Sequence, residues 1–283
     1  MSVSNFRTGV FAAILISLCG VFPASGDLPG LDDRQWAGHF VGFSNRAFQF
    51  GLATDGKAKI EVIGQKEKTV SHVLAVSVQF AVEEVRPDGK TVLKTILPET
   101  LESAQAATKE PRDVVFKGKV KGDASFQASV HEERGVISLG GKLLDPGTLT
   151  KNPVRFVIRV NFPNAYPYDK DRTAGKKEMK AFEQKTEKDR LQLKWTDGKI
   201  RKQSLSDSVD AASKEIYGPG IAMFNLEFSS YQEKKFDFVA SANSTMTLSN
   251  SAVQPLHDGF AVTWLADPEK DPEGKARLSF HVK

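Results

Sequence analysis

The sequence has almost no cysteine: Cys19 is the one cysteine in 283 residues. A lipoprotein acylation site needs a small residue just before the cysteine, and Leu18 stands there instead. If the N-terminal segment is removed, the remaining chain has no disulfide and no thiol chemistry. An exported chain of this size then depends on its hydrophobic core, unlike the small scaffolds that disulfides hold together.

Long apolar runs are missing too. The most apolar stretch, residues 9–22, follows Arg7 and precedes Pro23 and the small residues 24–26. This order predicts a secretory signal peptide over residues 1–26, cleaved after Gly26, with a retained N-terminal anchor as the alternative. A membrane-spanning helix needs about 20 apolar residues. We therefore expect a secreted or periplasmic protein whose mature chain has no transmembrane segment.

A strong excess of one charge sign is absent as well. The formal net charge is +4, and the removed segment contributes only Arg7 to it. Such a mild lysine excess does not indicate a nucleic-acid partner, and export disfavours one further.

Catalytic signatures do not stand out. There is no G-x-S-x-G elbow, and no two histidines have the short spacing of a local metal-ligand pair. A glycosidase needs two carboxyl groups across the scissile bond. Adjacent acidic pairs do occur, at Asp32-Asp33, Glu83-Glu84 and Glu132-Glu133. Neighbours on a strand point to opposite faces, so no such pair forms that arrangement by itself.

What the chain does have is alternation of apolar and polar residues with period two. One stripe consists of Leu74, Val76, Val78, Phe80 and Val82, and another of Val154, Phe156, Ile158, Val160 and Phe162. Strands alternate in this way when one face meets a core and the other meets water, as in antiparallel sheets. Asp-Gly recurs at residues 55–56, 88–89, 197–198 and 258–259, and each occurrence is a hairpin candidate.

We therefore predict an all-β fold: an antiparallel β-sandwich forming one large two-layer domain over residues 27–283. A few short helices are expected over residues 99–109, 174–190 and 206–216. Two smaller sandwiches in tandem, joined near residues 161–175, are the alternative. Trp36, Trp195 and Trp264 share the parity of core residues and should be buried.

The clearest candidate for ligand binding is the Pro- and Tyr-rich segment that follows the second stripe. Tyr166 and Tyr168 offer aromatic faces for sugar rings, and Asn164 and Asp169 lie beside them in the sequence. Binding pockets combine apolar walls with a few polar groups, and loops often carry them. These residues are the predicted glycan site, with packing of the tyrosines over the sandwich edge as the alternative.

Calcium is the one metal that the sequence suggests, and no other cofactor is expected. Acids alternate along one short segment, at Asp267, Glu269, Asp271 and Glu273. Hard cations need several converging oxygen ligands, and alternating acids in a loop can supply them. A solvated hairpin is the competing interpretation.

Basic residues form the last candidate site. Lys117, Lys119 and Lys121 share one face of a predicted strand, and Arg155 and Arg159 share one face of another. If the two strands paired, they would form a basic stripe suited to an acidic polysaccharide. Lysines on strands also protect against aggregation.

These observations favour an exported, non-catalytic binding or envelope-surface module for a glycan or an extracellular protein. A secreted enzyme that acts on polysaccharide, with carboxylates gathered from separate strands, is one alternative. A structural assembly component is the other. A fold of this kind serves many functions, so its site must decide.

Overall fold

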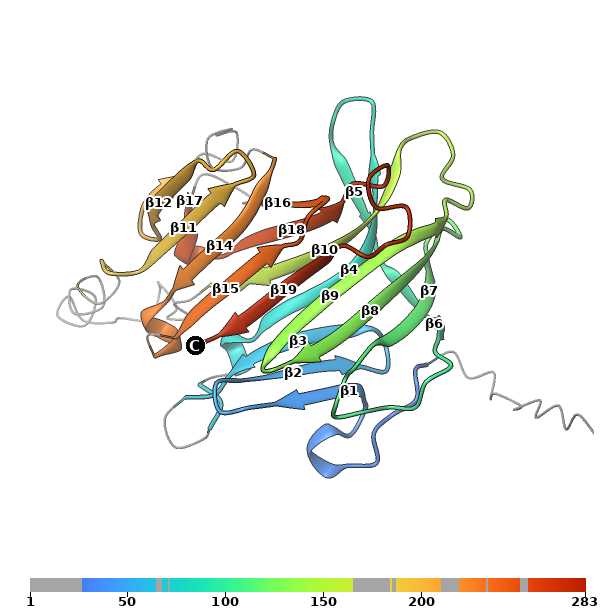
Figure 1. The fold of residues 1–283 in the computed structure, drawn as a ribbon, viewed down its shortest axis with the longest axis horizontal. Coiled ribbons are helices and arrows are strands. Elements are labelled where there is room, and N and C mark those ends of the chain that lie inside the picture. The colour runs from blue at the N-terminus through green and yellow to red at the C-terminus, as the bar shows by residue number, and fades with distance from the viewer. Residues whose placement is uncertain are drawn as a thin grey trace, which may run out of the picture.

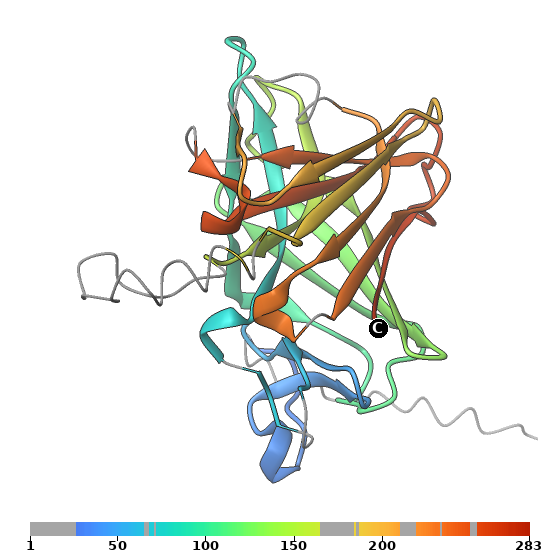
Figure 2. The same ribbon diagram turned by 90° about the vertical axis from the view of Figure 1, so that its left-hand side faces the viewer.

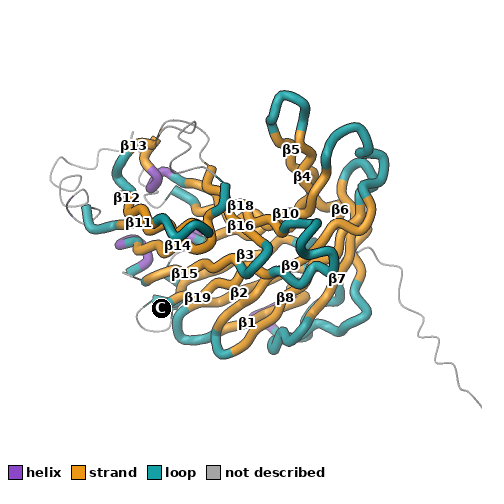
Figure 3. The backbone as a smooth tube through the Cα atoms, turned by 45° about the horizontal axis from the view of Figure 1, so that its top comes forward, coloured by secondary structure: helices purple, strands orange, loops and turns teal. Residues whose placement is uncertain are grey.

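The computed structural model describes residues 27–64, 68–70, 72–164, 184, 187–209, 219–232, 234–249 and 254–283. Strands dominate this part of the chain (Figure 1; Figure 3). All the strand pairings within the 17-stranded main sheet are antiparallel, and this sheet curls so that two layers face each other (Figure 2). The predicted antiparallel sandwich is confirmed.

The first layer contains the two stripes recognised in the sequence. Its strands, in spatial order, are β1 (His39–Ser44), β2 (Phe48–Ala53), β3 (Lys57–Val62), β4 (Val76–Val85), β10 (Val154–Phe162), β18 (Phe260–Ala266) and β16 (Ser244–Ser249). The short strand β5 (Thr91–Lys94) pairs with the far end of β4.

The second layer lies across the core from the first. Its order is β12 (Ile200–Ser204), β11 (Arg190–Trp195), β14 (Ile221–Glu227), β15 (Lys235–Ala240), β19 (Arg277–Val282), β9 (Val136–Asp145), β8 (Ser125–Glu133), β7 (Val114–Val120) and β6 (Ile96–Glu102). The layers join where Ile221 of β14 pairs with Met246 of β16. Strands from both sides of the predicted sub-boundary near residues 161–175 therefore lie in one sheet.

Phenylalanine rings fill the space between the layers. Phe162, which is 3% exposed, stacks on Phe260 at 4.7 Å and also contacts rings of the opposite layer. Those rings are Phe224, Phe228, Phe236 and Phe238. Aromatic pairs at these separations add to the free energy gained from area burial alone. The two period-two stripes thus form part of the inner face of the first layer, and the rings of the second layer pack against them.

Three of the four Asp-Gly sites form hairpin turns as predicted. They connect β2 to β3, β4 to β5 and β11 to β12, and their glycines have φ angles of 82°, 77° and 88°. In each turn the aspartate accepts a hydrogen bond from the lysine N–H two residues on. The fourth prediction is wrong, because Gly259 ends a 3-10 helix, η5 (Leu256–Asp258).

The helix predicted over residues 99–109 is not confirmed. These residues are not helical. Strand β6 continues to Glu102, and after it side-chain hydrogen bonds to β7 take the place of the backbone hydrogen bonds between the two strands. Ser103 Oγ donates to the Val115 carbonyl, and Gln105 Oε1 accepts from the Val115 N–H. Such side-chain bonds to backbone compete with helix formation.

Of the predicted helix over 206–216, residues 208–209 form the two-residue strand β13 (Ser208–Val209), which pairs with β17 (Gln254–Pro255). The predicted signal segment, residues 1–26, lies outside the described residues. Of the helix predicted over 174–190, only residues 184 and 187–190 are described, and Arg190 begins β11.

The remaining described elements are short 3-10 helices: η1 (Arg34–Trp36), η3 (His72–Leu74) and η4 (Ser229–Tyr231). Among the residues that the structure describes, no helix has the length and apolarity needed to cross a membrane.

Candidate functional site

The outer face of the first layer carries two parallel rows of mostly polar side chains. We name them the Arg159 row and the Asn161 row, after their members on the central strand β10. The register places one member of each row on each of β3, β4, β10, β18 and β16. The Arg159 row is Lys57, Gln79, Arg159, Thr263 and Thr247, and the Asn161 row is Lys59, Ser77, Asn161, Ala261 and Ser249. At the usual strand spacing, each row is about 19 Å long.

Most of the positive charge on this face is neutralised within the protein. Lys57 Nζ lies 2.6 Å from Asp55 Oδ2, and Lys59 Nζ lies 3.1 Å from Glu61 Oε1. Arg155, on β10, has Nη2 2.6 Å from Glu83 Oε2. Of the four basic side chains on the five strands that carry the rows, these three have carboxylate partners.

Arg159 is the exception. Its Nε donates to Asn161 Oδ1 at 3.0 Å, and Asn161 Nδ2 donates to Ser77 Oγ at 3.2 Å. Throughout the described ranges, its guanidinium has no other hydrogen bond and no ion pair. The cross-strand neighbours of Arg159 are Gln79 and Thr263, which are both uncharged. Among the described residues, the face therefore holds one half-buried cation without a counter-ion, flanked by the partly exposed amide of Gln79 and the buried hydroxyl of Thr263.

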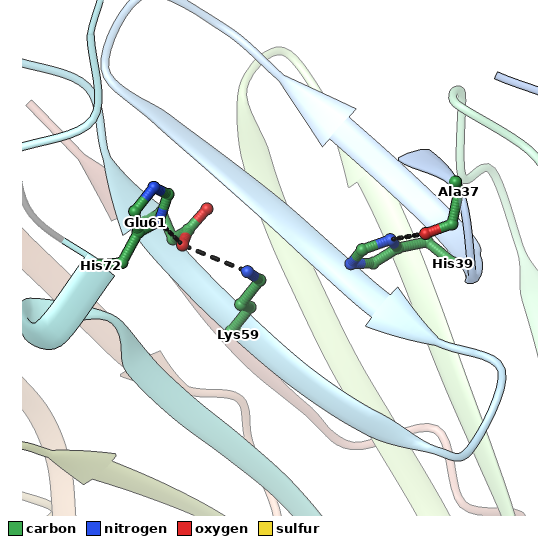
Figure 4. A network of polar contacts seen from close by, with 5 residues as sticks. All are labelled: Ala37, His39, Lys59, Glu61 and His72. Carbon is green, nitrogen blue, oxygen red and sulfur yellow. Dashed lines mark hydrogen bonds and ion pairs between the residues drawn. The ribbon is translucent and has the colours of Figure 1, made fainter. Parts of the chain in front are cut away.

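A buried carboxylate marks one edge of this face (Figure 4). Glu61 is 7% exposed and bonds to His72 Nδ1 at 2.8 Å and to Lys59. Burial alone would raise the pKa of the Glu61 carboxyl, but the hydrogen bonds from His72 and Lys59 outweigh it and hold this pKa below its ordinary value. Glu61 is thus an anion with local partners, poorly suited to act as a proton donor near neutral pH.

Beyond Lys59, the Asn161 row continues onto two glycines that aromatic rings cover. Gly51 pairs with Lys59, and Gly42 pairs with Gly51. A Cβ atom on Gly42 would lie 2.3 Å from the Trp36 ring, so glycine is needed there. Trp36 packs edge-on against His39. The Nδ1 atom of His39 lies 3.3 Å from the Ala37 carbonyl oxygen (Figure 4). The predicted burial of Trp36 is confirmed, as it is for Trp195 and Trp264.

The glycan site predicted from the sequence is only partly visible. Tyr166, Tyr168 and Asp169 lie outside the described residues. Asn164 is described and exposed, two residues after the end of β10. The predicted loop therefore begins at the end of the strand that carries Arg159 and Asn161, and its role in binding stays a prediction.

The four acids of the predicted calcium loop follow strand β18. Asp267 Oδ1 accepts from the Glu269 N–H at 3.1 Å, and Asp271 Oδ1 accepts from the Lys275 N–H at 2.8 Å. Asp267 and Glu273 also pair with Lys270 and Lys275. In the described ranges, no group of three or more acidic, histidine or cysteine side chains could hold a metal. Asp267 and Asp271 stabilise the turns here, and calcium binding stays a prediction.

The predicted basic stripe does not form. Arg155 and Arg159 lie on β10, which pairs with β4 and β18, whereas Lys117 and Lys119 lie on β7 in the other layer. The stripe depended on these two strands being paired, and matching alternation on two strands says nothing about whether they are neighbours. Lys121 is exposed just beyond β7.

A groove of about 1300 Å³ lies along β6 and β7. Leu101, Val115 and Leu144 contribute apolar walls, while Lys117, Lys119, Glu99 and Glu102 contribute charges of both signs. Because these charges are of both signs, the groove does not favour a ligand of either charge, whereas the Arg159 row has a single unpaired cation among the described residues.

The adjacent acids Glu83 and Glu84 point to opposite faces, as strand geometry predicts. Glu83 binds Arg155 on the outer face, while Glu84 binds Lys94 at 2.8 Å and Asn152 at 2.6 Å. The two carboxylates therefore have separate basic partners and do not face each other.

Comparisons with known proteins reveal a shared fold. No family model matches the chain, and no curated protein matches it. Among solved structures, it is similar to alpha-N-acetylgalactosaminidase NagBb from Bifidobacterium bifidum. For the GalNAc complex the TM-score is 0.50 at 11% identity, over 86% of this chain and 35% of that one. For a quadruple mutant the TM-score is 0.52 at 11% identity, over 86% and 36%.

The chain thus spans about a third of the length of the galactosaminidase. A second similar structure is the Slr1438 protein from Synechocystis sp. PCC 6803, with a TM-score of 0.44 at 10% identity, over 84% of this chain and 92% of that one. At 11% identity, the likeness to the galactosaminidase concerns the fold alone.

Proposed function

We propose that the protein is an exported, non-catalytic binding module that holds a glycan on the outer face of its first layer. The observation that carries this proposal is the Arg159 row, in which the Gln79 amide, the Arg159 guanidinium and the Thr247 hydroxyl are partly exposed in register, while Thr263 between the last two is buried. Sugar hydroxyls both donate and accept hydrogen bonds, and these side chains offer both kinds of partner.

The rigidity of the platform supports the same proposal. The row is built on paired strands rather than on loops, so binding would order few groups and lose little conformational entropy. The galactosaminidase whose structure is similar acts on a sugar, as its name states, which is compatible with a glycan ligand here.

The test is thermal melting of the purified protein against a panel of soluble neutral and acidic polysaccharides. A ligand that binds only the folded state stabilises it by about 2.7 kcal/mol at a hundredfold excess over Kd. We expect one or more polysaccharides to raise the melting temperature. No shift with any of them would contradict the glycan function for that panel, and would favour a protein partner or a structural role.

A matched pair of variants locates the ligand. Gln79→Ala removes an outward amide from the Arg159 row, while Gln127→Ala removes one from β8 in the second layer. We expect Gln79→Ala to weaken binding by about tenfold or less, the worth of one neutral hydrogen bond, and Gln127→Ala to leave it unchanged. Equal effects would place the ligand elsewhere. Release of shortened glycan products would favour the alternative of a polysaccharide-acting enzyme.

A further inference from the structure

We propose that the ligand of the polar face is an acidic glycan, and that Arg159 binds the carboxylate of one of its uronate residues. This inference rests on the proposed glycan function and adds the chemical class of the sugar. It follows from a difference between two arginines on the same face of the same strand.

Arg155 and Arg159 are four residues apart on β10, and both point outward. Arg155 lies opposite Glu83 in the register, and the two form an ion pair. Arg159 lies between Gln79 and Thr263, neither of which can neutralise it. The protein therefore compensates one guanidinium internally and leaves the other without a counter-ion in the described part of the chain.

The side chain of Arg159 is held in place before any ligand arrives. Its Nε is bound to Asn161 Oδ1, and the Asn161 amide is anchored in turn to Ser77. A guanidinium has five N–H donors, so both terminal Nη groups remain to be satisfied. Two parallel N–H donors match the two oxygens of a carboxylate, and the resulting charge-assisted bonds are stronger than neutral ones.

The surroundings of Arg159 favour a sugar acid over a more highly charged ligand. Lys57 and Lys59, the other cations of the two rows, already have carboxylate partners. Among the described residues, the face thus offers one unpaired positive charge beside the partly exposed neutral groups of Gln79 and Thr247. A uronate residue has the matching composition, with a single carboxylate among hydroxyls.

The experiment compares polymers that differ only in the carboxylate. Polygalacturonate, alginate and hyaluronate are each titrated calorimetrically into the purified protein beside their carboxyl-reduced forms. One or more of the acidic polymers should bind about tenfold to hundredfold more tightly than its reduced form, as expected for a hydrogen-bonded charge. Arg159→Gln should remove this difference, because it should weaken binding of the acidic polymer much more than binding of the reduced polymer.

Two further variants distinguish the contribution of the planar guanidinium from that of its positive charge alone. Arg159→Lys keeps the charge but lacks the planar fork, so it should recover only part of the lost affinity. Lys117→Gln removes an exposed charge from the second layer and should change the affinity less than twofold, because exposed charges at a distance are screened. If Arg159→Gln melts at a lower temperature, Arg159→Lys serves as the test variant.

The outcomes distinguish this inference from the function on which it rests. Equal binding of acidic and reduced polymers, unaffected by Arg159→Gln, would overturn the acid specificity and leave the glycan function intact. Failure of every polymer to bind would overturn both. Equal weakening by Arg159→Gln and Lys117→Gln would indicate non-specific charge attraction. Tighter binding of dextran sulfate, titrated in the same way, would overturn the assignment to a carboxylate.

Discussion

The two faces of strand β10 have opposite roles, although their residues alternate along the same nine positions. Inward, Phe162 joins rings from both layers in the core. Outward, Arg155, Arg159 and Asn161 are bound to neighbouring polar groups and to each other. The comparison teaches that core packing and the polar contacts of the surface are separated here by side-chain parity. Substitutions on the two faces should therefore affect different measurements.

The largest expected effect is on the inner face. Phe162→Ala should lower the free energy of unfolding by about 3–5 kcal/mol, because it leaves a cavity among five aromatic rings. Urea unfolding checks this. The matched control is Asn161→Ala, the adjacent residue on the outer face, which should cost about 1 kcal/mol. Equal costs would mean that the two faces are not separated in the way we describe.

A smaller loss of stability is expected from a substitution that removes a buried hydrogen bond, that of the Tyr231 hydroxyl. The Tyr231 hydroxyl, in η4, donates to the Leu74 carbonyl at 2.7 Å, and burial raises the pKa of this phenol well above its ordinary value. Tyr231→Phe should lower the free energy of unfolding by about 1–3 kcal/mol, the cost of leaving a buried carbonyl unsatisfied. A loss below about 0.5 kcal/mol in urea unfolding would show that this hydrogen bond contributes little.

The smallest expected change in stability comes from Glu61 on the outer face, and it appears only at acidic pH. The pKa of Glu61 is lower in the folded state than the ordinary value of 4.5. Its contribution to stability is therefore present above that ordinary value and is lost as the pH falls through the lower folded pKa.

Glu61→Gln should reduce the loss of stability as the pH falls below the ordinary value of 4.5, measured as the urea midpoint at several pH values. Glu269→Gln is the control, since Glu269 is exposed and has no ion pair among the described residues. An unchanged pH profile in Glu61→Gln would show that the contacts with His72 and Lys59 do not form in solution.

Local features of the sequence predicted much of the fold. The stripe over residues 154–162 has the bounds of β10, and three Asp-Gly-Lys turns are hairpins. These signals are local, because alternation and turn chemistry depend on residues a few positions apart. The helix expected over 99–109 was wrong because Ser103 and Gln105 bind the backbone of β7, a strand that comes later in the chain.

The candidate site depended much more on tertiary structure. The sequence pointed to Tyr166 and Tyr168, which are easy to recognise because they cluster in one loop. It also placed Arg155 and Arg159 on one face of a strand, which was the available signal for the polar face. It could not show that Glu83 neutralises the first of them and that Gln79 and Thr263 flank the second.

By itself, then, the sequence determined which side of each strand is apolar, where three hairpins turn, and that the fold is an antiparallel sandwich. Only the tertiary structure decided which strands are neighbours, and therefore that residues 79, 159 and 263 lie in one row. The physical reason is the distance along the sequence over which each property is determined. Side-chain parity follows from backbone geometry within a strand, whereas register follows from how the whole core packs between the layers.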